Sequence, residues 1–388
     1  MFTPAFNPAS IQPVSPKLAI DFTTASLDSR ITFTRTGNTA TVTNSSGNVV
    51  GINADLPRFD YNPITLACNG LLIEEQRQNI MTYSDQFNNA VYTKVNSSVT
   101  ADAVTSPDGT TNADLLLPNT TNGQHRLDFT STATAATHSF SVYAKGGGYN
   151  FIWIRIGTSG GVASLTDGTT SSVTAGYTLT ATLVANGWYR VVLVGTAAAN
   201  AIVRINALST NNTNDYAGNG TSGIYIWGAQ LEAGSFPTSY IPTVAAAVTR
   251  NADVAVMTGT NFSDWYNSTQ GTFRVDATTP ASGTRPIISA DDNTAANSIV
   301  ISTVTTAPTL VVTQNSSEQA NVSAGTITAN TAMFAYVSYA SNYFGIARPT
   351  ARQVDTSGTV PTVDRLRLGA NQAGSYLNGY LQFLRFWS

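Results

Sequence analysis

The sequence predicts an all-β protein made of tandem antiparallel β-sandwich (jelly-roll) modules that follow an extended N-terminal arm. The first observation is compositional: only 11% of the 388 residues are Asp, Glu, Lys or Arg, against about 25% in ordinary soluble domains. Thr, Asn, Ser and Gly supply the polar surface instead, and these residues favour strands and turns over helices. The second observation is that alternating apolar and polar runs recur between Gly- and Asn-rich turns, without helical periodicity. The length favours two or three domains, because one core rarely grows beyond about 250–300 residues.

The beginning of the chain predicts an arm and a small module. Residues 1–16 contain four prolines and little hydrophobic periodicity, which indicates an extended arm. Residues 17–78 contain short strand-like runs, and the turn at 44–47 is typical of a β-hairpin. We therefore expect a small β module for anchoring over residues 17–78.

The alternation is clearest between residues 79 and 249. In residues 151–156, Ile152, Ile154 and Ile156 share one face of a predicted strand, opposite Phe151, Trp153 and Arg155. Similar strands are predicted at 139–145, 188–194 and 223–231. Glycine- and asparagine-rich turns separate them, so we expect a carbohydrate-module-like β-sandwich over residues 79–249.

A second sandwich is predicted over residues 250–388. Residues 241–253 lack a strand-length alternating pattern, which favours a connector that proteases cut first, between two separable folding units. Strand-like runs then resume at 271–276, 286–289, 298–302, 309–313, 332–339, 365–368 and 379–387. No fixed-period repeat is found, which disfavours a solenoid.

Charge and cysteine content restrict the partners and the compartment. The net charge of −3 gives no basic footprint for nucleic acid, and no apolar stretch approaches the ~18 residues of a membrane span. Cys68 is the single cysteine, and the N-terminus does not resemble a secretion signal. The polar, charge-poor surface is nevertheless typical of extracellular proteins. A virion component, assembled in the bacterial host cytoplasm and released by lysis, satisfies both observations.

Several segments resemble tailed-bacteriophage structural and tail-fibre proteins. LPRFDYNP at 56–63, GLLIEEQR at 70–77 and YSDQF at 83–87 carry the resemblance. In such proteins these segments precede a carbohydrate-module-like sandwich, and residues 186–190 and 224–232 look like its later strands. The closing residues 377–387 are similar to the last strand of laminin-G and concanavalin-A-like jelly rolls. The resemblance implies fold and virion context, and it implies no catalytic residue.

Residues capable of catalysis or metal binding are few. His125 and His138 have no neighbouring Cys or His at metal-ligand spacing, and no Gly-x-Ser-x-Gly motif is present. The doublets Glu74–Glu75 and Asp291–Asp292 would point to opposite faces of a strand, so neither predicts a catalytic pair. Residues 291–293 indicate a turn, with a calcium loop as the lesser alternative. We expect no cofactor, no metal and no catalytic residue.

Aromatic residues are the remaining candidates, because sugar rings pack against Trp and Tyr side chains. The candidate glycan-binding residues are Phe151, Trp153 and Arg155 on one strand, and Tyr225 and Trp227 on another. Burial of these aromatics in a core is the stronger alternative.

These observations predict a non-enzymatic virion structural protein, a tail fibre, spike or decoration protein, that attaches to host-surface glycan. A polysaccharide depolymerase and a purely architectural capsid decoration protein are the alternatives. Other virion proteins are the expected partners. A homo-oligomer is expected as well, with a trimer favoured by analogy with phage fibres.

Overall fold

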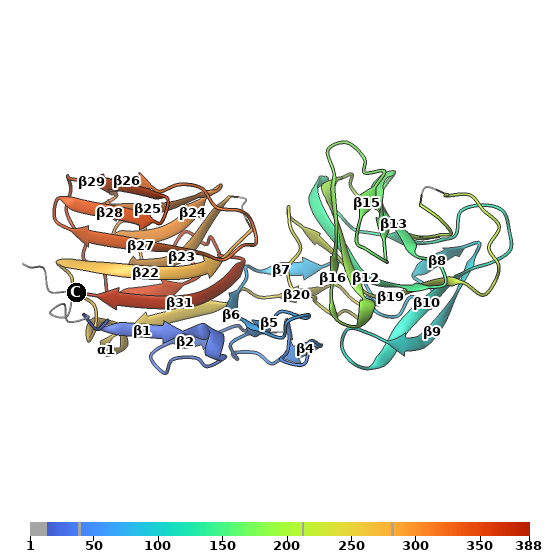
Figure 1. Ribbon diagram of the computed structural model, residues 1–388, viewed down its shortest axis with the longest axis horizontal. Coiled ribbons are helices and arrows are strands. Elements are labelled where there is room, and N and C mark those ends of the chain that lie inside the picture. Colours follow the sequence, from blue (N-terminus) through green and yellow to red (C-terminus); the bar gives the residue numbers. More distant parts are fainter. Residues whose placement is uncertain (1–13, 38–39, 212, 281–282) are drawn as a thin grey trace, which may run out of the picture. The chain divides into compact units, whose positions relative to one another are not determined.

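Strands make up nearly all the regular structure of the computed structural model, which describes residues 14–37, 40–211, 213–280 and 283–388 (Figure 1). Within these ranges, helix is confined to α1 (Thr260–Ser263) and the 3-10 turns η2 (Phe22–Thr24) and η3 (Ala185–Gly187). The predicted all-β class with antiparallel sandwiches is therefore confirmed. The arm predicted at 1–16 lies outside the described residues as far as residue 13.

Contacts divide the chain into two units. Unit 1 contains Met1–Phe33, Gly70–Glu74 and Val254–Ser388, and unit 2 contains Thr34–Asn69 and Glu75–Asp253. The sequence predicted one small module over residues 17–78, but the structure divides these residues between the two units. The strands in this range are too short to enclose a core, so some of them join larger sheets and the others form two-stranded sheets.

Unit 1 is a sandwich of two antiparallel sheets. Strand β1 (Leu18–Asp21) pairs with β31 of the first sheet. The first sheet has the order β29 (Ala351–Asp355), β28 (Tyr343–Arg348), β27 (Met333–Ala340), β22 (Gln270–Thr278), β31 (Gly379–Trp387), β6 (Cys68–Ile73). The second has the order β2 (Thr32–Thr34), β21 (Val254–Thr258), β30 (Arg365–Leu368), β23 (Thr284–Asp291), β24 (Ser298–Val304), β25 (Ala307–Gln314), β26 (Ser317–Ser323).

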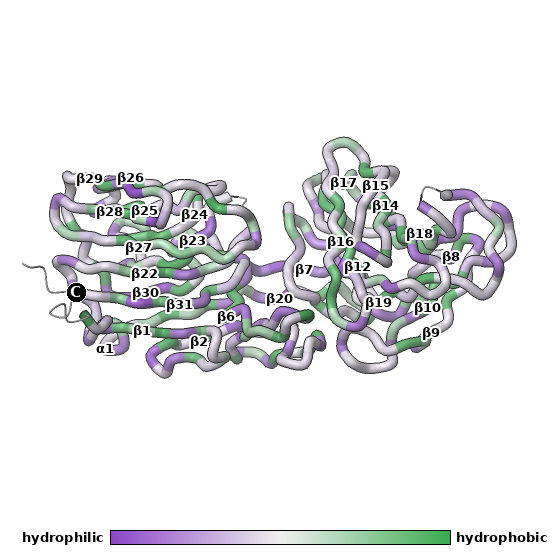
Figure 2. Tube along the Cα trace, viewed as in Figure 1, coloured by the Kyte–Doolittle hydropathy of each residue, from purple (hydrophilic) through white to green (hydrophobic). Residues whose placement is uncertain are grey.

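Alternation buries one face of several unit 1 strands. In β22, Phe273, Val275 and Ala277 are fully buried, whereas the side chains between them are less buried, and Figure 2 shows the mixed hydropathy along this strand. Asp291 ends β23, and residues 292–297 form a bend that returns to β24. The turn interpretation of residues 291–293 is therefore confirmed. The Asp291 carboxylate binds Arg367 at 3.0 Å.

Unit 2 is a second two-sheet sandwich. The first sheet, here called the β13 sheet, has the order β15 (Thr170–Ser171), β14 (Ser159–Ser164), β13 (Phe151–Ile156), β18 (Ile202–Leu208), β11 (Arg126–Thr130), β8 (Tyr92–Val95). The second, the β19 sheet, has the order β16 (Thr178–Leu183), β17 (Tyr189–Ala197), β12 (Ala136–Gly147), β19 (Gly223–Ala233), β10 (Thr111–Pro118), β9 (Ser97–Thr105). One continuous cluster of buried side chains from both sheets forms the core.

Unit 2 also contains short strands outside these sheets. The predicted hairpin is formed by β3 (Ala40–Thr43) and β4 (Val49–Ile52), and β5 (Phe59–Tyr61) follows it. Strand β7 (Arg77–Asn79) pairs with β20 (Val248–Arg250). Residues 241–253, predicted to be a connector between two folding units, belong to unit 2: Ile241, Arg250 and Asp253 are fully buried, whereas residues 244–247 are exposed. The burial of these three residues depends on polar side chains, which a search for hydrophobic alternation does not detect.

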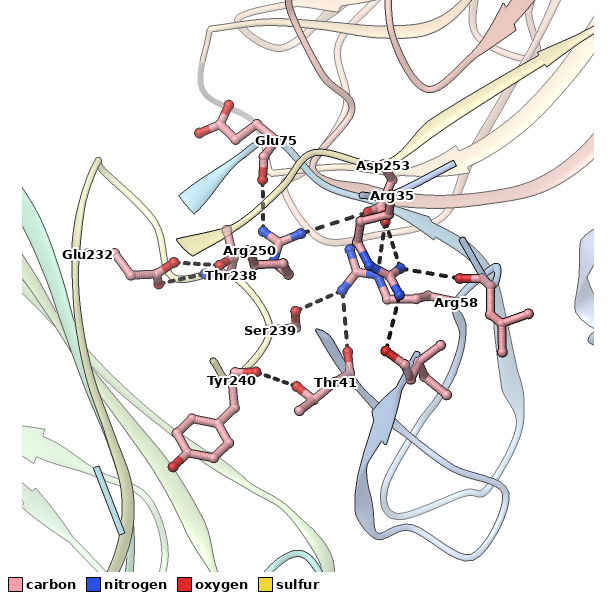
Figure 3. A network of polar contacts seen from close by, with 12 residues as sticks. Arg35, Thr41, Arg58, Glu75, Glu232, Thr238, Ser239, Tyr240, Arg250 and Asp253 are labelled. Atoms are coloured by element: carbon pink, nitrogen blue, oxygen red, sulfur yellow. Dashed lines mark hydrogen bonds and ion pairs between the residues drawn. The ribbon is translucent and has the colours of Figure 1, made fainter. Parts of the chain in front are cut away.

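A buried polar network holds residues 34–69 in unit 2. The carboxylate of Asp253 is surrounded by the guanidinium groups of Arg35, Arg58 and Arg250, and all four side chains are fully buried (Figure 3). Arg58 also donates to the Thr41 carbonyl and to Ser239 Oγ, at 3.3 and 2.8 Å. Long-range ion pairs of this kind connect the two stretches of chain that make up the unit.

Candidate functional site

Strand β13 divides its side chains between the core and the outer face of its sheet. Ile152, Ile154 and Ile156 are at most 2% exposed and belong to the unit 2 core. Because side chains alternate along a strand, Trp153 and Arg155 lie on the opposite face. The alternation predicted from the sequence is confirmed. Phe151 and Trp153 are half-buried and Arg155 is 9% exposed, so none of them projects freely into solvent.

Strand register places two further arginines beside Arg155. Arg155 is opposite Arg204 of β18, and Trp153 is opposite Asn206. Strand β18 in turn pairs with β11, where Arg204 is opposite Asp128 and Asn206 is opposite Arg126. The outer face of these three strands, which we call the arginine face, is made of Arg126, Asp128, Trp153, Arg155, Arg204 and Asn206.

The contacts of the arginine face hold its side chains in fixed positions. The Arg155 guanidinium lies 4.3 Å from the centre of the Trp153 ring, a cation–π contact. Its Nη2 donates to Gln124 Oε1 at 3.1 Å and to Asn206 Oδ1 at 3.3 Å. Asp128 accepts from Arg126 Nε at 2.9 Å and forms an ion pair with Arg204 Nε at 3.4 Å.

Positive charge exceeds negative charge on this face. Three guanidinium groups meet the single carboxylate of Asp128, a formal excess of two positive charges. Burial lowers the pKa of Arg155 to about 10, and repulsion from Arg204 and Arg126 contributes. Arg155 thus keeps its proton at neutral pH while bearing unfavourable electrostatic energy. A bound anion would reduce this unfavourable electrostatic energy.

Three buried donors on this face make no hydrogen bond to the described residues: Nε of Arg155, Nε1 of Trp153, and Nε of Arg204, which lies 3.4 Å from Asp128 Oδ1. Buried N–H groups are nearly always hydrogen-bonded, and leaving one unpaired costs about 1–3 kcal/mol. These donor atoms are themselves buried, so a ligand would reach this face at the more exposed guanidinium groups of Arg126 and Arg204.

Tyr225 and Trp227 do not join this surface. They lie on β19, in the other sheet, and Trp227 is 2% exposed. Its ring packs 5.3 Å from Tyr143 and 4.7 Å from Tyr240, in a cluster that also includes Trp188. Tyr225 is half-buried against the same cluster. The predicted platform of Tyr225 and Trp227 is therefore wrong for Trp227, and the stronger alternative of burial applies.

The burial of Trp227 has a definite cause. The Tyr240 ring packs on Trp227, Val49 packs against the same cluster, and Thr41 Oγ1 donates to the Tyr240 carbonyl at 2.5 Å. No comparable cluster of large aromatic side chains is recorded on the arginine face among the described residues.

The two histidines have structural surroundings. His125 is fully buried, with Nδ1 2.6 Å from the Asn96 carbonyl oxygen and Nε2 2.8 Å from that of Tyr216. Both ring nitrogens thus face backbone carbonyls. Nδ1 of His138 lies 3.0 Å from the Ala136 carbonyl of its own strand. In the part of the chain that the structure describes, no group of three or more His, Cys, Asp or Glu side chains could hold a metal ion.

Two open pockets lie elsewhere. One of about 660 Å³ in unit 2 is lined in part by Glu75, Arg77 and His138, and Arg77 binds the Glu75 carboxylate at 2.5 Å. The other, about 510 Å³ in unit 1, is lined in part by Phe262 and Tyr266. The arginine face differs from both pockets because it combines excess positive charge with unpaired buried donors.

No helix within the described ranges is long and apolar enough to cross a membrane.

Gln124, Arg126, Asp128, Arg204 and Asn206 were not among the sequence candidates. Alternation with Leu127 and Ile205 could have placed Arg126, Asp128 and Arg204 on an outward face. Their assembly around Arg155 depends on strand order and register, which short-range patterns do not specify.

Comparisons with known proteins give little further guidance. No family model matches the chain, and no curated protein matches it. Among solved structures, domains LG4-5 of the mouse laminin alpha1 chain are similar at 10% identity and a TM-score of 0.24, covering 68% of this chain and 84% of that one.

Proposed function

We propose that this chain is a non-enzymatic structural protein of a tailed-bacteriophage particle, a tail fibre, spike or decoration protein, and that its arginine face contacts host-surface glycan. The observation that carries the glycan contact is the formal excess of two positive charges on a face where Arg126 and Arg204 are accessible to a ligand. Hydroxyl and carboxylate oxygens of a saccharide are suitable acceptors for both groups.

Other features support the virion context. The charge-poor, Thr- and Asn-rich surface and the single cysteine suit a protein that folds in a bacterial cytoplasm and acts outside the cell. The resemblance of residues 56–63, 70–77 and 83–87 to phage structural proteins points in the same direction. We propose other virion proteins as partners, a homo-oligomer, most simply a trimer, as the assembled form, and the virion as the location.

Binding to purified envelope polysaccharide tests the proposal. The full chain should bind capsule or lipopolysaccharide of its host without releasing oligosaccharides. Trp153→Ala should weaken that binding, whereas Trp387→Ala, the same change at a half-buried tryptophan of unit 1, should not. Absence of binding to every host polysaccharide would refute the attachment role. Release of oligosaccharides would instead identify a depolymerase.

A further inference from the structure

The arginine face retains donors on all three of its guanidinium groups. Arg155 uses Nη2, Arg126 uses Nε and Nη1, and Arg204 uses Nη1 for the Gly157 carbonyl. Arg155 Nη1, Arg126 Nη2 and Arg204 Nη2 are left without a hydrogen bond to a described residue. The Arg126 and Arg204 side chains are 21% and 19% exposed, so both are accessible to a ligand.

The geometry points to an acidic saccharide as the ligand, and we infer that its carboxylate binds Arg155 together with Arg126 and Arg204. This inference rests on the proposed glycan attachment. A carboxylate is planar and accepts two parallel hydrogen bonds from a guanidinium group. It also supplies negative charge where Asp128 alone leaves a formal excess of two positive charges.

The neighbouring groups suit the rest of such a sugar. The half-buried Gln124 amide lies 3.1 Å from Arg155 Nη2 and can also bind a hydroxyl group. Arg155 covers one face of the Trp153 ring, so Trp153 positions the guanidinium. A long polyphosphate backbone is a poorer fit, because the chain as a whole has a net charge of −3.

Calorimetric titration of the full chain with matched ligands tests the inference. The probes are an oligogalacturonate, the same oligomer fully methyl-esterified, and a sulfated dextran. We expect the oligogalacturonate to bind at least about tenfold more tightly than its ester, which has the same rings without the charge. Its affinity should fall as salt is raised from about 50 to 500 mM. Equal affinity for the ester would overturn the inference, and tighter binding of sulfated dextran would overturn the choice of a carboxylate.

Variants identify the site. Arg126→Gln, Arg155→Gln and Arg204→Gln should each weaken oligogalacturonate binding about tenfold. Arg274→Gln is the matched control: Arg274 also lies over an aromatic ring, 5.0 Å from the centre of Phe334, but Asp276 already binds it through two hydrogen bonds of 2.8 and 2.7 Å. The Arg274→Gln variant should bind oligogalacturonate as tightly as the wild type does. Three arginine variants that bind like the control would overturn the site.

The Asp128→Asn variant distinguishes an effect on ligand binding from an effect on folding. Removing the single carboxylate increases the excess of positive charge, so this variant should bind oligogalacturonate more tightly although it loses two ion pairs. Misfolding cannot produce tighter binding, and weaker binding by Asp128→Asn would contradict the inference. If the wild type binds host polysaccharide but does not distinguish the oligomer from its ester, attachment stands and the acidic-sugar inference fails.

Discussion

Arg58 and Asp253 are 195 positions apart in the sequence, yet they form a fully buried ion pair with two hydrogen bonds. Arg35 binds the same carboxylate at 3.1 Å, and Arg250 lies 3.8 Å from it. Burial lowers the pKa of Arg35, and the charge of Asp253 opposes this effect. Asp253 is therefore the group around which residues 34–69 are fixed to the rest of unit 2.

Asp253→Asn should destabilise unit 2 by about 3–5 kcal/mol, because it removes the negative partner of three buried guanidinium groups. Urea unfolding followed by tryptophan fluorescence measures the loss. Glu318→Gln, the corresponding change from carboxylate to amide at an exposed position of β26 in unit 1, should stay within about 0.5 kcal/mol of wild type. A stability of Asp253→Asn equal to that of the control would show that Asp253 is not the organising group.

Two tryptophans on outward-facing positions should respond differently to truncation. Trp227→Ala leaves a cavity in the cluster with Tyr143, Trp188 and Tyr240, and should cost about 3–5 kcal/mol. Trp153→Ala removes a half-buried ring and should cost about 1 kcal/mol, while weakening glycan binding. Thermal unfolding of both variants checks the difference. Equal losses would mean that Trp153 is a core residue.

Asp114 predicts a pH dependence of stability. Its side chain is 1% exposed, and burial raises the pKa of its carboxyl to about 6, although the Asp102 and Phe87 amides donate to it and oppose the shift. In the unfolded chain this pKa is about 3.9. The folded state therefore holds the proton more tightly, and the stability that this proton contributes is present below about pH 4 and lost as the pH rises through about 6.

Asp114→Asn should remove this dependence, because the amide stays neutral and resembles the protonated acid. The stability of Asp114→Asn relative to wild type should increase by about 1–3 kcal/mol between pH 4 and pH 8. Denaturant unfolding at a series of pH values checks it. Parallel pH profiles for the two proteins would show that the carboxyl is not penalised by burial.

The proposed oligomer and arm are tested together. Multi-angle light scattering should give a trimer for the intact chain. Deleting residues 1–16 should leave the circular dichroism of both units unchanged and prevent incorporation into particles, because a proline-rich arm would gain order on docking to a neighbouring protein. A monomer that incorporates normally without these residues would contradict both proposals.

Local patterns were sufficient for the strands but not for their grouping. The alternation of residues 151–156 predicted which face of β13 enters the core, and the turn after Asp291 followed from its residue types. The division of residues 17–78 between two units, and the burial of Arg250 and Asp253, were missed. Both features depend on contacts with residues more than 150 positions away, such as Arg58. A pattern within a short stretch of sequence does not include those residues.

The sequence by itself determined that Trp153 and Arg155 lie opposite a row of isoleucines, because a strand alternates its side chains with a period of two. The tertiary structure alone decided what covers each outer face. Tyr240 packs over Trp227 on one sheet, whereas strand register brings Arg126 and Arg204 beside Arg155 on the other. The covering of a sheet face and the register of its strands both depend on contacts between distant segments. Two strands with similar aromatic patterns therefore differ in the structure: one contributes to a buried cluster and the other to a charged surface.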